Sequence, residues 1–417
     1  MASFSFSIFL PLFFFLLTIV SSSSNSIFIP ITKDNTTQQY TTTLSFGTPF
    51  VATNLVVDLS GSHFWVDCSS TKTSSSLSSI PHRSVQCLTA KSHTQTWVSS
   101  LENENPIDQD SPCEIVAKNT ITGKVATEGK LVEDVLAVKS MKDSIFEPAH
   151  EYLFTCSNTL LLNGLSNDAK GIVGFGRSRT SFSSQFFNSI DSDRKITFCL
   201  SSSSGFVSLG RRNKVSESEI FRSLTFTPLV TNQNMEYFIN VNSIKIGGKK
   251  VSFNTLSLSQ EGNSGTLLSS IVPYTTMQSS IYANFKSAIL KAALSMNISR
   301  VDSVAPFEIC FGSNGIGASK IGPNVPVIDL VLQSEMVKWR IHGRNSMVRV
   351  SDDVMCLGIL DGGDEQKNLI VIGGYQLEDV LVQFDFDSSM VGFSSSLLIR
   401  DTSCSNFRFG SMDVQSS

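Results

Sequence analysis

Short segments in which apolar and polar residues alternate recur along most of the chain. They are rich in β-branched and aromatic residues and are bounded by Gly, Asn, Asp or Ser, which is typical of β-strands with one buried face. Strands are predicted at Tyr40–Phe46, Asn54–Val57, Phe64–Asp67, Gly129–Val138, Ile196–Leu200, Phe206–Leu209, Tyr237–Ile246 and Val380–Phe386. The pattern therefore indicates an all-β protein.

One segment has helical rather than alternating spacing. After Ser279 and Ser280, either of which can cap a helix, apolar residues recur at helical intervals. These residues are Ile281, Phe285, Ile289, Ala292 and Met296. A second, shorter helix is predicted at Ser183–Ile190. Helices are thus expected to be few.

A weak internal duplication appears in motifs that end in a polar residue or a glycine. The apolar strand Leu55–Asp58 is followed later by Ile172–Gly174, and Thr266–Ser269 is followed by Val371–Gly373. A glycine in the second element lets one strand pass close behind another and present its polar end at a cleft. The repeat predicts two lobes that face each other across a groove.

Composition places the chain among globular proteins. Of its 417 residues, 41% are hydrophobic and 16% are charged, so it can bury a large core. The net charge of −4 argues against a nucleic-acid partner, which normally requires a basic surface. The length favours two halves, which we expect as an N-terminal β-lobe at residues 25–210 and a C-terminal β-lobe at residues 211–417.

The first residues have the pattern of a targeting segment. Phe4–Val20 is mostly apolar and Ser21–Ser24 follows it. Such a short run ending in small residues is typical of a secretory signal peptide, predicted here at residues 1–24, and a membrane anchor is the alternative. We therefore expect a secreted, extracellular protein that has no membrane partner once the signal is removed.

The cysteines agree with secretion. Their count is even, their spacings are wide and no Cys-x-x-Cys occurs, which favours disulfides over a metal site. The eight are Cys68, Cys87, Cys113, Cys156, Cys199, Cys310, Cys356 and Cys404, and their spacing does not fix the pairing. Asn35 and Asn297 lie in glycosylation motifs.

Four segments resemble the pepsin-like aspartic protease family, over nearly the whole mature length. They are Asn54–Cys68, Gly171–Gly176, Ile372–Gly374 and Val382–Phe393. The resemblance implies a bilobal all-β fold with few short helices. It also implies the disulfides Cys68–Cys156, Cys87–Cys113, Cys199–Cys404 and Cys310–Cys356.

Four further tracts resemble a plant branch of that family more narrowly. This branch holds the dermal-glycoprotein type of xyloglucanase inhibitor, the xylanase inhibitors and the basic seed globulins. The tracts are Ser269–Thr275, Leu332–Glu335, Asn345–Met347 and Cys404–Phe407.

The resemblance fails where proteolysis needs it. Working members use two aspartates that share one proton, each followed by Thr-Gly or Ser-Gly. Here Asp58 is followed by Leu59 and Ser60, and Ser269 occupies the position of the second aspartate. Ile121 falls near the place of the tyrosine that covers the cleft in working members. We therefore expect no catalytic residues and treat Asp58 and Ser269 as vestigial, with residual proteolysis through Asp58 as the remaining enzymatic alternative.

Other chemistry finds little support in the sequence. The five histidines are dispersed, and no Gly-x-Ser-x-Gly or metal-binding spacing occurs. Gly171–Gly176 has the wrong spacing for a dinucleotide loop. Trp65 is expected in the core, whereas Trp97 and Trp339 could stack on sugars. We expect no cofactor and no metal.

The resemblance implies a partner instead of a substrate. Inhibitors of this branch block the clefts of microbial glycanases, and a cation between two catalytic carboxylates is the natural device. Lys320 and Arg400 are the positions that look closest to such cations, and ordinary solvated charge is the alternative. The hypothesis is an inhibitor of a microbial endoglucanase, or else of a xylanase. A binding or storage globulin that recognises a peptide or polysaccharide is the second hypothesis.

Overall fold

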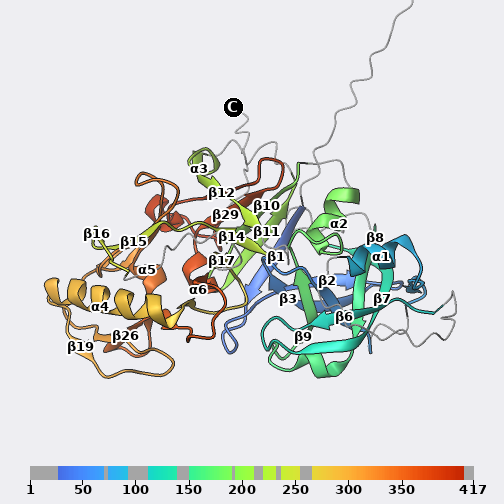
Figure 1. Cartoon of the computed structure of the whole chain (residues 1–417), viewed down its shortest axis with the longest axis horizontal. Coiled ribbons are helices and arrows are strands. Elements are labelled where there is room, and N and C mark those ends of the chain that lie inside the picture. The colour runs from blue at the N-terminus through green and yellow to red at the C-terminus, as the bar shows by residue number, and fades with distance from the viewer. Residues whose placement is uncertain are drawn as a thin grey trace, which may run out of the picture.

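The computed structural model describes residues 27–69, 74–92, 111–138, 150–189, 193–210, 219–231, 236–253 and 265–407. The expected signal peptide and Trp97 lie outside these residues. In Figure 1 the blue-to-green first half and the yellow-to-red second half of the chain lie side by side.

One fourteen-stranded sheet combines strands from both halves. In spatial order its strands are β12 (Thr225–Pro228), β30 (Met390–Phe393), β29 (Leu381–Asp385), β10 (Lys195–Cys199), β11 (Ser204–Leu209), β1 (Ile27–Lys33), β2 (Tyr40–Phe46), β3 (Val51–Asp58), β9 (Ala169–Gly174), β4 (Phe64–Asp67), β8 (His150–Ser157), β7 (Val125–Ala137) and β5 (Ser78–Ser79), with β6 (Glu114–Lys118) paired to β7. Because β29 pairs with β10, the end of the chain returns to the first half.

The second half adds four smaller sheets. The six-stranded sheet contains, in spatial order, β13 (Val230–Thr231), β14 (Tyr237–Ile239), β17 (Thr266–Leu268), β28 (Ile370–Ile372), β18 (Thr275–Met277) and β27 (Ile359–Asp361). One four-stranded sheet contains β16 (Lys249–Lys250), β15 (Ser243–Ile246), β23 (Ile328–Val331) and β24 (Lys338–Ile341), and the other contains β19 (Arg300–Val301), β20 (Cys310–Gly312), β26 (Val354–Leu357) and β25 (Met347–Arg349). The two-stranded sheet pairs β21 (Ala318–Ser319) with β22 (Gly322–Pro323).

The predicted single strand at Tyr237–Ile246 is wrong, because β14 and β15 belong to different sheets. The exposed Asn240 and Asn242 separate them, and the Asn242 amide donates to the Val331 carbonyl. The Asn242 amide thus already bonds to β23, which means that the chain changes sheets directly after Ile239.

Helices are short and few among the described residues. They are α1 (Val85–Lys91), α2 (Phe182–Ser189), α3 (Glu219–Arg222), α4 (Ser279–Ser295), α5 (Gly343–Ser346) and α6 (Gly374–Leu377), with 3₁₀ turns η1 (Thr159–Leu162) and η2 (Leu397–Arg400). The predicted all-β fold with few helices is confirmed.

Helix α4 buries the predicted face only in part. Ile281, Phe285 and Ile289 are buried, but Ala293 is buried in place of Ala292, and Met296 is 45% exposed. The predicted serine cap is also wrong: Gln278 stands at the N-cap without a side-chain hydrogen bond. Burial of the apolar face, and not capping, thus holds this helix.

The predicted duplication is present in the strand topology. In the first half β3 runs parallel to β9, β9 is antiparallel to β4, and β4 is parallel to β8. In the second half β17, β28, β18 and β27 repeat these relations in the same order. Asp58, the last residue of β3, and Ser269, directly after β17, therefore stand at the ends of equivalent strands.

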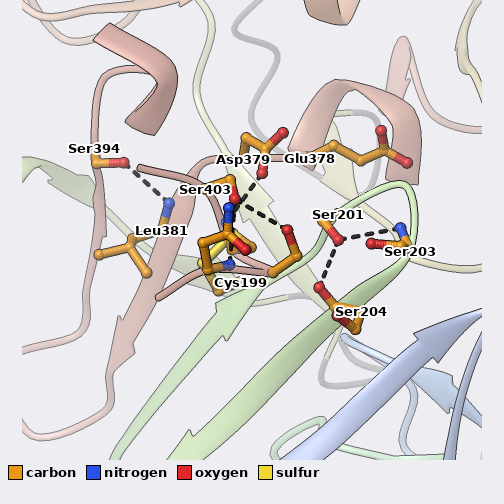
Figure 2. The surroundings of a disulfide bond; sticks show 12 residues. Cys199, Ser201, Ser203, Ser204, Glu378, Asp379, Leu381, Ser394 and Ser403 are labelled. Atoms are coloured by element: carbon orange, nitrogen blue, oxygen red, sulfur yellow. Dashed lines mark hydrogen bonds between the residues drawn. A yellow bond between two sulfur atoms is a disulfide. The ribbon is translucent and has the colours of Figure 1, made fainter. Parts of the chain in front are cut away.

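Four disulfides join the pairs that the family resemblance implies: Cys68–Cys156, Cys87–Cys113, Cys199–Cys404 and Cys310–Cys356. Figure 2 shows the surroundings of the Cys199–Cys404 bridge, where the Cys404 amide donates to the Asp379 carboxylate at 3.0 Å. This bridge ties the C-terminal segment to strand β10. Four disulfides are typical of proteins from oxidising compartments.

Candidate functional site

Asp58 ends strand β3, pairs with Gly174 and is only 4% exposed. The Thr120 hydroxyl donates to its Oδ2 atom at 2.8 Å. Gly61 lies against the same carboxylate, since a Cβ there would come within 2.3 Å of Oδ2. Gly61 stands one position later than the glycine that follows the catalytic aspartate of working proteases. Because it has no side chain, it leaves room for the Asp58 carboxylate.

The pKa of Asp58 is raised to about 6, mainly by burial and to a smaller extent by the charge of Glu236. The Thr120 hydrogen bond and the backbone amides of Gly61 and Ser60 oppose this rise. A buried carboxyl of this kind changes its protonation in mildly acidic solution.

Ser269 follows strand β17, one residue beyond the Leu268–Ile372 pair. Its amide donates to the Ile372 carbonyl at 3.0 Å. Its hydroxyl accepts from the amides of Ile271 and Val272, at 3.1 and 3.3 Å. The hydroxyl therefore stabilises its own turn and is not held by Asp58.

Ser270 joins the two repeats directly. Its hydroxyl donates to the Val57 carbonyl at 2.7 Å and accepts from the Leu59 amide at 2.9 Å. Leu59 is the equivalent of Ser270 in the first repeat. It is buried and has no hydroxyl, so it cannot make the reciprocal contact with the second repeat. One serine thus makes the cross-connection at the strand ends.

The hairpin between β6 and β7 covers Asp58 and is held by Asn119. This fully buried side chain donates to the carbonyls of Leu161 and Asn163, and accepts from the amides of Ile121 and Thr122. All four bonds are 2.7 to 3.0 Å long. The hairpin is thereby fixed in position at its turn, next to Thr120.

Apolar side chains fill the space beside this hairpin. The cluster contains Val56, Trp65, Ala117, Leu161, Leu165, Ala169, Ile172 and Ile271, with Ile121 packed against it. Ile271 comes from the second repeat, directly after Ser270, so the cluster spans both halves. Trp65 is fully buried in it, as expected, and its indole donates to the Lys118 carbonyl at 3.0 Å.

The structure places Lys320 and Arg400 in neighbouring segments of the surface. Lys320 lies in the turn between β21 and β22, and its ammonium is 2.5 Å from the Asp401 carboxylate. The Lys320 and Asp401 side chains are 68% and 70% exposed. Arg400 instead donates to the Ser223 hydroxyl at 2.9 Å, so the two cations contact different partners.

Sequence reasoning missed Thr120, Asn119 and Asp401. Thr120 and Asn119 stand in a turn, where such residues signal only turn chemistry. Asp401 lies beside Arg400 in the sequence, and an acid adjacent to a candidate cation was a usable signal. Its left-handed conformation, with φ of 55°, places it in the turn after η2.

Two family models match the chain: xylanase inhibitor N-terminal at residues 40–211 and xylanase inhibitor C-terminal at residues 236–395. The chain belongs to the pepsin-like xylanase inhibitor family. Probable aspartic proteinase GIP2 of Nicotiana benthamiana is 40% identical to it, over 93% of this chain and 92% of that one.

Solved structures agree with this membership. The crystal structure of edgp is 39% identical and has a TM-score of 0.81, covering 93% of this chain and 99% of that chain. The basic 7S globulin from soybean is 31% identical with a TM-score of 0.77, covering 93% and 100%. The recognised family and the bilobal fold are therefore both confirmed.

The histidine, tryptophan and metal-binding candidates of this xylanase inhibitor family member add no further chemistry to the Asp58 site. Burial, with the charge of Lys118, lowers the pKa of His63 to about 4. Trp339 is buried and stacks on Phe393 with centroids 4.7 Å apart, so it does not present a face to sugars. Within the described ranges, no group of three or more His, Cys, Asp or Glu could hold a metal.

The two glycosylation motifs are accessible in this family member. Asn35 is exposed in the turn between β1 and β2, and Asn297 is exposed just after α4 with φ of 58°. No helix in the described part of the chain is both long and apolar enough to cross a bilayer.

Proposed function

We propose that this chain is a secreted, catalytically inert inhibitor of a microbial cell-wall-degrading endoglucanase, a xyloglucanase, acting in plant defence in the apoplast or cell wall. The observation that carries the proposal is that the buried Asp58 stands at the end of one strand and a serine, Ser269, at the end of the equivalent strand. Aspartic proteolysis needs two carboxyls that share one proton, and a serine hydroxyl does not replace one of them. We assign Ser269 to the place of the second catalytic aspartate on this basis.

The covered acid supports an inert site. Thr120 takes the Oδ2 atom of Asp58 as its acceptor, and Asn119 holds the surrounding turn. A peptide substrate would have to displace both contacts and the apolar cluster around Ile271. An active aspartic endopeptidase is therefore the least favoured hypothesis. Asp58→Asn tests it, because any proteolysis that survives this substitution does not come from Asp58.

We assign inhibition to Lys320 and Arg400. The Lys320–Asp401 pair is exposed on both sides, so a partner's carboxylate can compete for this ammonium at little cost. Arg400 presents a planar guanidinium, whose geometry suits two oxygens of one carboxylate. Glycoside hydrolases offer two such carboxylates flanking the scissile bond.

The test is titration of a fungal xyloglucan-specific endoglucanase with the purified mature chain at mildly acidic pH. Complete loss of activity near one-to-one stoichiometry supports the proposal. Lys320→Ala and Arg400→Ala together should abolish inhibition, whereas Arg349→Ala, an exposed arginine on β25, should leave it unchanged. Undiminished inhibition by the double variant would refute the site assignment.

A second candidate is an extracellular globulin that binds or stores a peptide or polysaccharide. The similarity to the basic 7S globulin from soybean favours it. A folded protein that inhibits neither xyloglucanase nor xylanase would select this candidate over the first. Inhibition of xylanase alone would keep the glycoside hydrolase partner and change the target.

Glycosylation at Asn35 and Asn297 belongs to the same proposal of secretion. Both asparagines lie on exposed turns, as glycan acceptors usually do. Protein expressed in a secretory host should carry a glycan on each asparagine. Asn35→Gln should remove one of these glycans and Asn297→Gln the other.

A further inference from the structure

A cationic face lies on the four-stranded sheet of β16, β15, β23 and β24. Strand register places Lys250 opposite Lys245, Lys245 opposite Asp329, and Asp329 opposite Arg340, in one row across four strands. Residues directly opposite each other on neighbouring strands share one face of a sheet. Figure 1 shows β15 and β16 at the far edge of the second half, away from the β6–β7 hairpin.

The other face of this sheet is apolar. Ile246, Ile328 and Ile341 form one row of buried residues, and Ile244, Leu330 and Trp339 form the next. Alternation along the strands therefore directs the charged row away from the core. Lys338, two residues before Arg340 on β24, adds a further cation on the charged side.

Three lysines influence the exposed carboxylate of Glu335, which lies in the turn between β23 and β24. Lys245 lies 2.5 Å from Glu335, and its hydrogen bond is the main cause that lowers the pKa of Glu335. The charges of Lys250 and Lys338 lower that pKa further. Arg340 donates to Asp329 at 2.8 Å.

The face carries an excess of positive charge on an acidic chain. Lys245, Lys250, Lys338 and Arg340 give four positive charges against two negative ones, Asp329 and Glu335, a difference of +2. The whole chain has a net charge of −4. Among the described residues, no carboxylate lies within ion-pair distance of Lys250 or Lys338. This local excess attracts anions even though the chain as a whole repels them.

We propose that this face binds a linear carboxylated polysaccharide, a polyuronate. The row runs across strands that are spaced about 4.8 Å apart, so cations on β16, β15 and β24 can meet successive carboxylates along an extended chain. The contact with Glu335 shows that Lys245 donates to a carboxylate. In these two hairpins only Met336, at 93% exposed, presents a large apolar side chain to solvent. Protein interfaces usually need aromatic or apolar anchors, so a polyanion fits better than a protein.

The experiment measures retention of the full chain on immobilised polygalacturonate at low ionic strength. Wild type should be retained and should elute with salt, because exposed charge pairs are screened. The triple variant Lys245→Ala, Lys250→Ala and Lys338→Ala should bind about tenfold more weakly or not at all, about 1.4 kcal/mol or more. Lys250→Glu, a single change on an exposed edge strand, should weaken binding in the same direction.

A matched triple variant separates the face from net charge. Lys124→Ala, Lys130→Ala and Lys170→Ala remove the same charge from exposed positions of the first half and should leave retention unchanged. An equal loss in both triples, retention on fully methyl-esterified polymer, or no retention of wild type would overturn the proposal. Equal retention on poly-L-glutamate would overturn the assignment to polysaccharide. Inhibition of a glycanase is a separate readout, since Lys320 and Arg400 are intact in both triples.

Discussion

Lys33 and Glu378, 345 positions apart in the sequence, form an ion pair of 2.7 Å buried between strand β1 and the end of helix α6. Their side chains are only 6% and 2% exposed. The Tyr40 hydroxyl donates to the same Glu378 oxygen at 3.0 Å, and the Lys33 ammonium lies over the rings of Tyr40 and Tyr375. The pair joins the two halves of the molecule at a buried contact.

Breaking this pair from one side should be strongly destabilising. Glu378→Ala leaves Lys33 charged and buried without a partner, and we expect a loss of about 3–5 kcal/mol in the free energy of unfolding. Urea unfolding measures it. Lys245→Ala, which breaks the more exposed pair with Glu335, is the control and should cost much less. Equal effects of the two changes would show that the burial of the first pair is unimportant.

Asp58 should make stability fall as pH rises. Its pKa in the folded protein, about 6, is above its ordinary value of 3.8, so between these values the folded state binds more protons than the unfolded state. The contribution of Asp58 to stability is then greatest below pH 4, decreases through the window to pH 6 by about 3 kcal/mol, and stays level above it. Asp58→Asn should flatten this part of the profile, as measured by urea unfolding from pH 3.5 to 7. A variant with the same slope as wild type would rule out Asp58 as its origin.

Restoring an acid at the second strand end should not restore proteolysis. Ser269→Asp provides a second carboxyl, but Thr120 still takes the Oδ2 atom of Asp58 and the apolar cluster still fills the space beside it. The new buried acid should also destabilise the fold, because it loses the amide contacts in their present geometry and adds a charge near Asp58. Peptide hydrolysis at pH 3 to 5 is the measurement. Cleavage by Ser269→Asp that disappears when Asp58→Asn is added would contradict this expectation.

Asn119 should control the accessibility of the β6–β7 hairpin. Asn119→Ala removes four hydrogen bonds from a buried position and leaves two carbonyls and two amides without this partner. We expect a loss of about 2–4 kcal/mol in the free energy of unfolding and faster cleavage by trypsin after Lys118 or Lys124. Limited proteolysis followed by mass spectrometry locates the cut. Asn163→Ala, which removes only an exposed side chain and keeps the accepting carbonyl, is the matched control.

The sequence predicted this fold well where local pattern and close strand packing coincide. Asp58 and Ser269 could be placed at equivalent strand ends because an apolar strand ending in glycine follows each of them later in the sequence. In the structure each of these later strands pairs in parallel with the strand of Asp58 or Ser269. Trp65 was recognisable as core from its apolar strand. Strand breaks such as the one between β14 and β15 depend on which sheet each half joins, which the alternation does not encode.

The contacts that define the site could not be predicted in the same way. Thr120 reaches Asp58 across 62 positions, and Lys320 reaches Asp401 across 81 positions. Hydroxyl and carboxylate partners at such separations leave no periodic signal, because only the fold brings them together. Candidate cations could be named from the sequence, but their partners in the free protein could not.

The disulfide Cys199–Cys404 closes a loop of the backbone 205 positions long. Hydrolysis of any one peptide bond inside this loop therefore yields two polypeptides that remain a single covalent molecule. Such a nicked form would migrate as one band without reductant and as two bands with it. Because β10 and β29 also share a sheet, its pieces keep their partners after the cut. The number of chains in a preparation thus reports its history of processing, and not a subunit composition.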